Sequence, residues 1–170
     1  YQAYFRMALS GREEPLTTHA DSYHWNTHFS NGSYNKGSIF LHQLSSIIGQ
    51  PVLDQILLKY FDQWKFKHPT PQDLKKIAEK ESGMDLEWYW EQWIGTVNTV
   101  DYALRQVTQN PKSGQTELVL ERVGRMPMPV DVEVILEDSS KMIFSIPLAA
   151  MQGSKSKDVY DGPLIACTPW

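Results

Sequence analysis

The sequence contains a single cysteine, Cys167. One thiol excludes an internal disulfide framework and a zinc site built from cysteines. No apolar run reaches the roughly 18–20 residues of a membrane-spanning helix, so we expect no membrane span in this chain. The 16 basic residues are outnumbered by 20 acidic ones, and they form no cluster long enough to follow a phosphate backbone. This charge pattern argues against nucleic acid as a partner.

A signal peptide is also not visible, and one cysteine says little about the compartment. We favour a periplasmic or secreted location over the cytoplasm. The 170 residues are 41% hydrophobic and 21% charged, ordinary values for a globular protein of one domain or two small ones. The first nine residues already follow a helical pattern without a cap, so we expect a piece of a longer polypeptide.

Residues 1–96 carry the apolar spacing of amphipathic helices. Tyr4, Met7 and Ala8 fit one face of a first helix that would end at Gly11, and the polar residues 12–33 are predicted to form a long loop. Further helices are expected at residues 35–48, 51–64, 71–82 and 86–94. Their boundaries follow from glycines after the helices, prolines in the first turns, and the cap Thr70 with Asp73 in the turn that follows.

From about residue 97 the apolar period becomes two, the spacing of strands with one buried face. Alternation is predicted at residues 100–104, 116–120, 130–136 and 142–146, with residues 164–167 as a final strand. The sequence therefore predicts an α+β fold in two segments. Residues 1–96 would form a helical bundle lobe and residues 97–170 an antiparallel β-sandwich-like domain.

Tyr34 lies in the run Gly-Ser-Tyr-Asn-Lys-Gly, directly before the apolar helix expected from residue 35. A phenol at a helix start can donate a hydrogen bond without bringing a charge of its own. It is therefore suited to stabilise an oxyanion in a reaction. The alternative is a partly buried tyrosine that serves only in packing.

His24 and His28 are four residues apart, the spacing that binds zinc in H-E-x-x-H helices. Trp25 follows His24, so the catalytic glutamate of that motif is missing, and the segment has no helical pattern. We favour histidines that face solvent or brace a loop over a metal site. Ser33, Ser38 and the pair at residues 45–46 have no G-x-S-x-G context, which argues against a serine nucleophile.

Tryptophans are concentrated in the segment around residues 88–93, with two more at residues 25 and 64. They form either an aromatic platform for sugars or peptides, or core packing at the junction of helices and sheet, which we favour. The acidic residues at positions 13, 14, 79 and 81 are expected to be solvated surface charges.

Several stretches occur together in one order. Glu-Pro-Leu-Thr-Thr-His-Ala-Asp precedes Ser-Tyr-Asn-Lys-Gly, and His-Pro-Thr-Pro-Gln-Asp-Leu precedes Glu-Trp-Tyr-Trp-Glu-Gln-Trp. This combination resembles the gluzincin zinc aminopeptidases, the family of aminopeptidase N and leukotriene hydrolase. The similarity covers residues 1 to about 105 and is weaker over the β half, where the family carries a sandwich domain.

The resemblance implies a role for Tyr34: in such enzymes the tyrosine at this place donates a hydrogen bond to the tetrahedral intermediate of peptide hydrolysis. It also implies that Lys36 and Gly37 support the turn and the helix. The family's zinc ligands and amine-binding glutamates have no counterpart here. We therefore expect an inactive fragment of a zinc-dependent aminopeptidase, whose missing N-terminal catalytic half would supply the zinc and whose substrates would be peptides. The alternative is a non-catalytic module that binds protein or carbohydrate.

Overall fold

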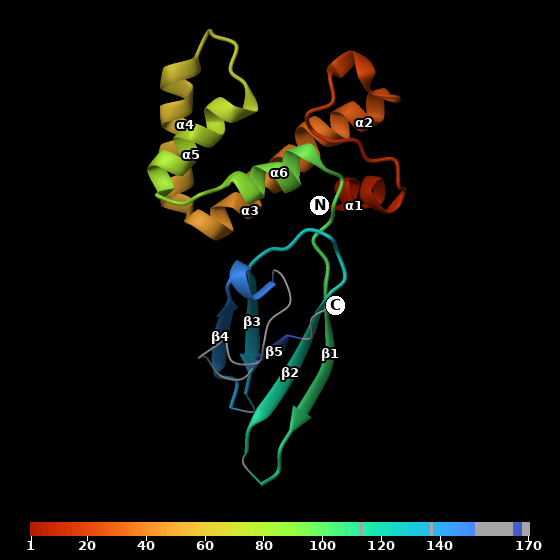
Figure 1. Ribbon diagram of the computed structural model, residues 1–170, viewed down its shortest axis with the longest axis vertical. Helices are drawn as coiled ribbons and strands as arrows, with labels where there is room; N and C mark the ends of the chain where they lie inside the picture. The colour runs from red at the N-terminus through yellow and green to blue at the C-terminus, as the bar shows by residue number, and fades with distance from the viewer. Residues whose placement is uncertain (113, 137, 152–164, 168–170) are drawn as a thin grey trace. The chain divides into compact units, whose positions relative to one another are not determined.

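The computed structural model describes residues 1–112, 114–136, 138–151 and 165–167. The described chain divides into two compact units, residues 1–97 and residues 98–170. The first unit is helical and the second contains the strands (Figure 1). The predicted α+β fold class is confirmed.

The helical unit begins with α1 (Gln2–Leu9), whose Tyr4 and Met7 are buried as the spacing predicts. A short 3-10 turn follows at Ala20–Ser22, and α2 (Asn26–Ser30) comes after it. The prediction of a continuous loop over residues 12–33 is therefore wrong. Short polar helices of this kind have no apolar stripe, so periodicity does not reveal them.

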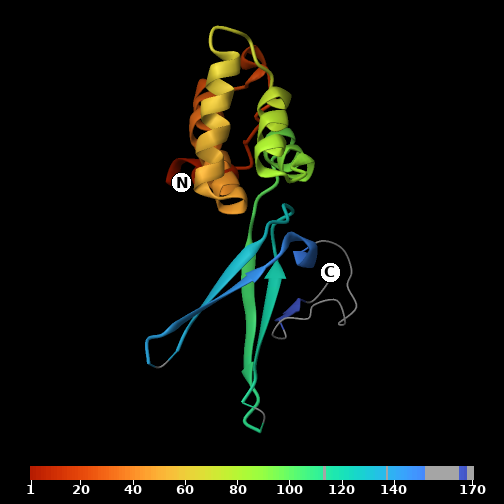
Figure 2. The same ribbon diagram turned by 90° about the vertical axis from the view of Figure 1, so that its left-hand side faces the viewer.

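The rest of the unit consists of the π-helical segment η2 (Asn31–Lys36) and four α-helices. These are α3 (Gly37–Ile48), α4 (Gln50–Trp64), α5 (Pro71–Ser82) and α6 (Glu87–Gly95). Helices α4 and α5 lie side by side (Figures 1 and 2), and α3 packs against α4. Gly49 and Gly83 end α3 and α5 with positive φ angles of 86° and 69°, as their positions in the sequence predict.

An aromatic cluster forms the core of this unit. The Phe40 ring on α3 lies 5.0 Å from the Trp90 ring and 5.1 Å from the Tyr89 ring, measured between centroids. Trp90 and Trp93 are 2% and 3% exposed, so they are core residues and the platform alternative fails for these two, whereas packing at the junction with the sheet stays a prediction. Their ring contacts are to residues of the helical unit.

The described residues of the strand unit form two small sheets. Strand β1 (Tyr102–Gln109) pairs antiparallel with β2 (Thr116–Arg122), and β3 (Val130–Ile135) pairs antiparallel with β4 (Lys141–Ile146). Strand β5 (Ile165–Cys167) pairs parallel with β2, so the prediction of purely antiparallel pairing is wrong for this strand. A short 3-10 turn covers Leu148–Met151.

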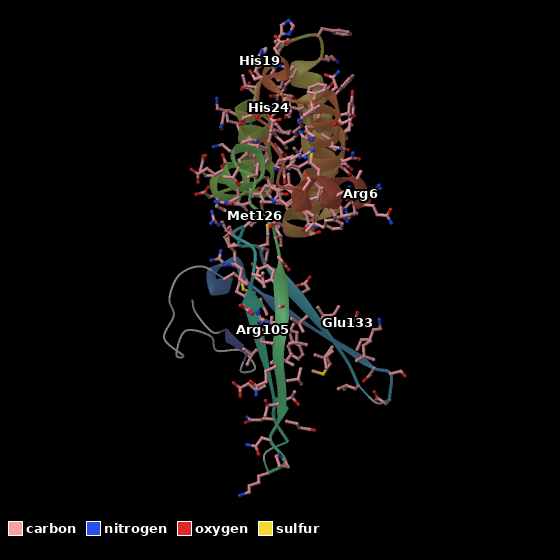
Figure 3. The ribbon with its side chains drawn as sticks, turned by 90° about the vertical axis from the view of Figure 1, so that its right-hand side faces the viewer. Arg6, His19, His24, Arg105, Met126 and Glu133 are labelled. Atoms are coloured by element: carbon pink, nitrogen blue, oxygen red, sulfur yellow. The ribbon has the colours of Figure 1, made fainter. Side chains whose placement is uncertain are left out.

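The strand unit has polar cross-strand contacts and buried methionines. Arg105 on β1 forms an ion pair with Glu121 on β2, and Glu133 on β3 accepts a hydrogen bond from the Lys141 ammonium at 2.9 Å (Figure 3). Met126 and Met128 are buried. Gly124 is required where it lies, because a Cβ atom there would be 2.2 Å from the Thr99 carbonyl oxygen.

Candidate functional site

Tyr34 lies inside a continuous helical stretch that runs from α2 through η2 into α3. The backbone of Lys36, which precedes α3, has helical angles of −66° and −41°, and the Gly37 amide donates to the Gly32 carbonyl. That bond reaches five residues back, which defines a π-turn. The tyrosine is therefore not at a free helix start, and the positive end of a helix dipole is not available beside it.

The Tyr34 side chain is 72% exposed. Within this chain the ring is therefore exposed, not partly buried. Among the described residues, no group forms a hydrogen bond with its hydroxyl. The phenol is therefore free to donate to a group that approaches this face of the helix.

The opposite face of η2 is buried. Gly32 and Lys36 are the two buried residues of the segment, and they are four positions apart. A Cβ atom on Gly32 would lie 3.3 Å from the Tyr23 hydroxyl, so the backbone packs closely there. The Asn35 side-chain amide donates to the Asn31 side-chain oxygen at 2.7 Å, which links both ends of the segment.

Lys36 forms a buried ion pair with Glu13. The ammonium lies 2.5 Å from a Glu13 carboxylate oxygen, and the two side chains are 0% and 3% exposed. Lys36 also donates to the Thr96 carbonyl oxygen at 3.0 Å. The prediction of a solvated charge at residue 13 is therefore wrong, whereas the supporting role expected of Lys36 agrees with this geometry.

The Glu13 charge also acts on its neighbour Tyr4. Burial, and after it the negative Glu13, raise the pKa of Tyr4 to about 12. Tyr4 is therefore neutral at any physiological pH. The Glu13 carboxylate is therefore paired with Lys36 and acts on a phenol, Tyr4, that stays neutral.

Glu14 lies between the two histidines that the sequence singles out. Its carboxylate accepts a hydrogen bond from the His24 amide at 3.2 Å and lies 3.4 Å from the His24 Nδ1 and 3.8 Å from the His28 Nδ1. Burial favours the neutral carboxyl, but the bonds and charge of His24 and the charge of His28 outweigh it and lower the pKa of Glu14. The arrangement braces the segment before α2, the alternative that the sequence favours for these histidines.

The described residues contain no group of three or more His, Cys, Asp or Glu that is arranged to hold a metal ion. The residues present therefore do not fit a zinc ion. Figure 3 shows His19 and His24 toward one end of the helical unit, and each has an acidic neighbour, Asp21 and Glu14 respectively.

No helix in the described part of the chain has the length and apolarity needed to cross a membrane.

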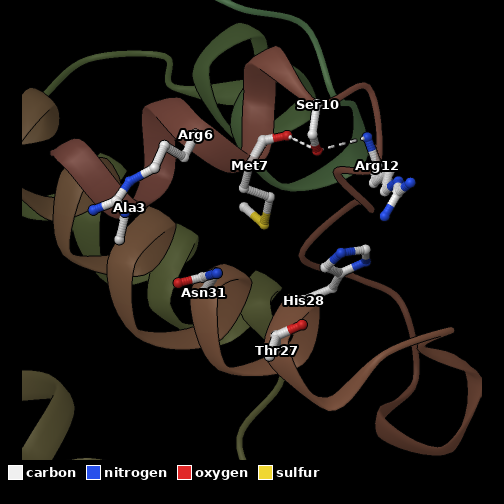
Figure 4. Close-up of a pocket in the computed structure, with 8 residues that line it drawn as sticks. All are labelled: Ala3, Arg6, Met7, Ser10, Arg12, Thr27, His28 and Asn31. Atoms are coloured by element: carbon white, nitrogen blue, oxygen red, sulfur yellow. Dashed lines mark hydrogen bonds between the residues drawn. The ribbon is translucent and has the colours of Figure 1, made fainter.

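A surface depression of about 390 Å³ lies between α1 and α2. Met7 is turned into it, with Arg6 and Arg12 on either side (Figure 4). Neither arginine forms an ion pair with a carboxylate of the described residues. Tyr34 does not line this depression, so the cavity and the tyrosine are separate features.

Comparison with known proteins decides which family these features belong to. A family profile described as the peptidase family M1 domain matches residues 1–93, more than half of the chain. The chain belongs to peptidase family M1. The resemblance to the gluzincin aminopeptidases is thereby confirmed at the level of the family. The M1 match ends just before the strand unit and contains η2, Tyr34 and the Glu13–Lys36 pair.

A curated relative agrees with the M1 assignment. The chain is similar to a protein of Sulfurisphaera tokodaii described as probable aminopeptidase 1, with 27% identity over 81 residues. The matched segment is 47% of this chain and 10% of the relative. The chain thus matches about a tenth of that relative's length.

Sequence reasoning named Tyr34 and Lys36 but missed Glu13 as a partner. One signal was present: Lys36, Phe40 and Leu44 recur every four residues, so the lysine lies on the buried stripe of α3. A cation on an apolar stripe predicts a buried and paired charge. Nothing in the local sequence indicates which carboxylate completes the pair.

Proposed function

We propose that this chain is part of an M1 zinc aminopeptidase and supplies Tyr34 as a hydrogen-bond donor to the tetrahedral intermediate. The single observation that carries the proposal is the phenol of Tyr34, 72% exposed on a helical segment whose other face is anchored. The M1 match over residues 1–93 supports peptide hydrolysis as the reaction. The zinc ligands and the amine-binding residues would come from other parts of the peptidase, so this chain alone would be inactive.

The chemical step attributed to Tyr34 is electrostatic. When a peptide carbonyl is attacked, its oxygen gains negative charge, and a fixed O–H donor stabilises that charge more than it stabilises the ground state. A neutral phenol can do this without adding a charge to the free site. Because the hydroxyl has no hydrogen-bond partner among the described residues, no internal bond has to break first.

The test is Tyr34→Phe in the full-length protein, which removes one oxygen and leaves the ring. We expect kcat to fall by roughly a hundredfold or more, the scale for loss of one oxyanion donor. KM should change little, because the interaction strengthens only in the transition state. Kinetics on an aminoacyl substrate and zinc content measure both effects.

Tyr60→Phe on α4 is the matched control, since it removes the same oxygen from a tyrosine of another helix. It should keep wild-type kcat. If Tyr34→Phe also keeps near-normal kcat, the phenol is not a catalytic donor and the proposal fails.

The alternative function is a non-catalytic binding module. It is weakened because two of the five tryptophans proposed as its platform, Trp90 and Trp93, are buried. The presence of H-E-x-x-H with a downstream glutamate elsewhere in the same polypeptide would favour the enzyme. Its absence from that polypeptide would favour the module.

A further inference from the structure

The Glu13–Lys36 pair connects three segments that are distant in sequence. Glu13 follows α1, Lys36 ends η2, and the Thr96 carbonyl that accepts from Lys36 follows α6. Both side chains are almost fully removed from solvent. A buried charge strongly resists separation from its partner, so this contact fixes Lys36 relative to both other segments.

Fixing Lys36 also fixes the direction of Tyr34. Residues two positions apart on a helix lie roughly half a turn from each other. Lys36 and Gly32 are buried, and Tyr34, two positions from each, is exposed. A rotation of η2 that moved the phenol would have to draw the ammonium away from Glu13 and Thr96.

We propose that Lys36 is the positioning residue for Tyr34: its ion pair with Glu13 and its bond to the Thr96 carbonyl hold η2 in the π register that turns the phenol outward. This inference rests on the proposed function of Tyr34. Lys36 itself touches no substrate, since its side chain is fully buried. A π-turn contains one more residue than an α-helical turn. The buried contacts of Lys36 keep that turn from relaxing to α-helical register.

The experiment is a double-mutant cycle in the full-length protein with Lys36→Met, Tyr34→Phe and both together. Lys36→Met alone should lower kcat by roughly tenfold to a hundredfold, the scale for misplacing a catalytic group by about 1 Å. KM and zinc content should be unchanged. In the Tyr34→Phe background Lys36→Met should cause no further loss, because the donor it positions is already gone.

Lys75→Met is the matched control, because Lys75 is another buried lysine, paired with Glu87 away from η2. It should leave kcat unchanged in both backgrounds. A Lys36→Met variant with normal kcat, or one whose loss is equal in both backgrounds, would overturn the inference. Should Lys36→Met fail to fold, Glu13→Gln takes its place in the same cycle, with the same criteria.

Amide hydrogen exchange separates this inference from the proposed function. If Tyr34→Phe keeps full kcat, the proposed function is lost, and exchange decides the role of Lys36 alone. Faster exchange in Lys36→Met confined to residues 31–36 supports the inference. Exchange that is unchanged there, or that rises equally in α4 and α5, overturns it.

Discussion

Glu13 and Glu14 are adjacent in the sequence after α1, but their side chains lie in different environments. Nothing in the local sequence predicts this difference. Glu13 is paired with Lys36 in the interior, whereas Glu14 accepts from His24 nearer the surface. A buried carboxylate must have a cation or several donors, because its desolvation is costly. Which of two adjacent acids turns inward depends on where the cation lies, and that cation is supplied by a later segment.

The Tyr89 hydroxyl offers a residue-scale test of the aromatic core. It is buried, and it donates to the Phe40 carbonyl oxygen at 2.6 Å. Burial raises the pKa of Tyr89 well above its usual value, so the group stays a donor. Tyr89→Phe should lower the free energy of unfolding by about 1 kcal/mol, the typical net value of one hydrogen bond.

Chemical denaturation of the 170-residue chain measures this change. Tyr60→Phe is the control, because Tyr60 is only partly buried on α4 and should cost less. Equal stability of Tyr89→Phe and the wild type would show that the buried bond contributes nothing net.

At the scale of elements, the predictable helices were those with clear capping residues at their starts and glycines at their ends. Helix α5 begins after Thr70, has proline in its first turn and ends at Gly83, as its residues indicate. The π-turn at η2 was not predictable, because its register depends on a buried contact and not on local propensity. Helix α2 was not predictable either, because it is too short to show an apolar period.

The cap of α5 gives a prediction about pH. The Thr70 hydroxyl and amide donate to the Asp73 carboxylate at 2.6 and 2.8 Å, and these bonds lower the pKa of Asp73. Since the folded pKa lies below the unfolded one, the stabilisation is present above about pH 4 and is lost as pH falls through the folded value. Asp73→Asn should therefore lower the melting temperature at neutral pH, and the gap should close in acid.

Thermal unfolding at neutral pH and below about pH 3 measures the two gaps. Asp62→Asn is the control, because Asp62 is 74% exposed and forms only a surface pair with Lys65. A gap between wild type and Asp73→Asn that is the same at both pH values would contradict the capping role.

At the scale of the whole molecule, the chain consists of a helical unit that belongs to an enzyme family and a strand unit beyond the family match. Within the first unit Tyr34 is exposed, but the described residues form no metal centre. The buried residues in the described part of the strand unit are Met126, Met128, Ile146 and Met151.

The donor set of the chain leads to a prediction about metal. The isolated, tag-free 170-residue chain should hold no stoichiometric zinc, because its described residues provide no set of three correctly spaced ligands. Metal analysis after exhaustive dialysis is the measurement. About one zinc retained per chain would contradict it, and loss of that zinc in a His24→Ala/His28→Ala variant would assign it to the histidine pair.

The sequence by itself determined the α+β fold class, most helix boundaries, the positions of the main strands and the family, because these depend on periodicity, caps and motif order. It also identified Tyr34 as the residue to examine. Only the tertiary structure decided that Glu13 pairs with Lys36, that Tyr34 lies in a π-turn and that β5 runs parallel to β2. Each of these depends on which distant segments meet, since a buried charge, an irregular helix register and a strand direction are set by the partner and not by the local residues.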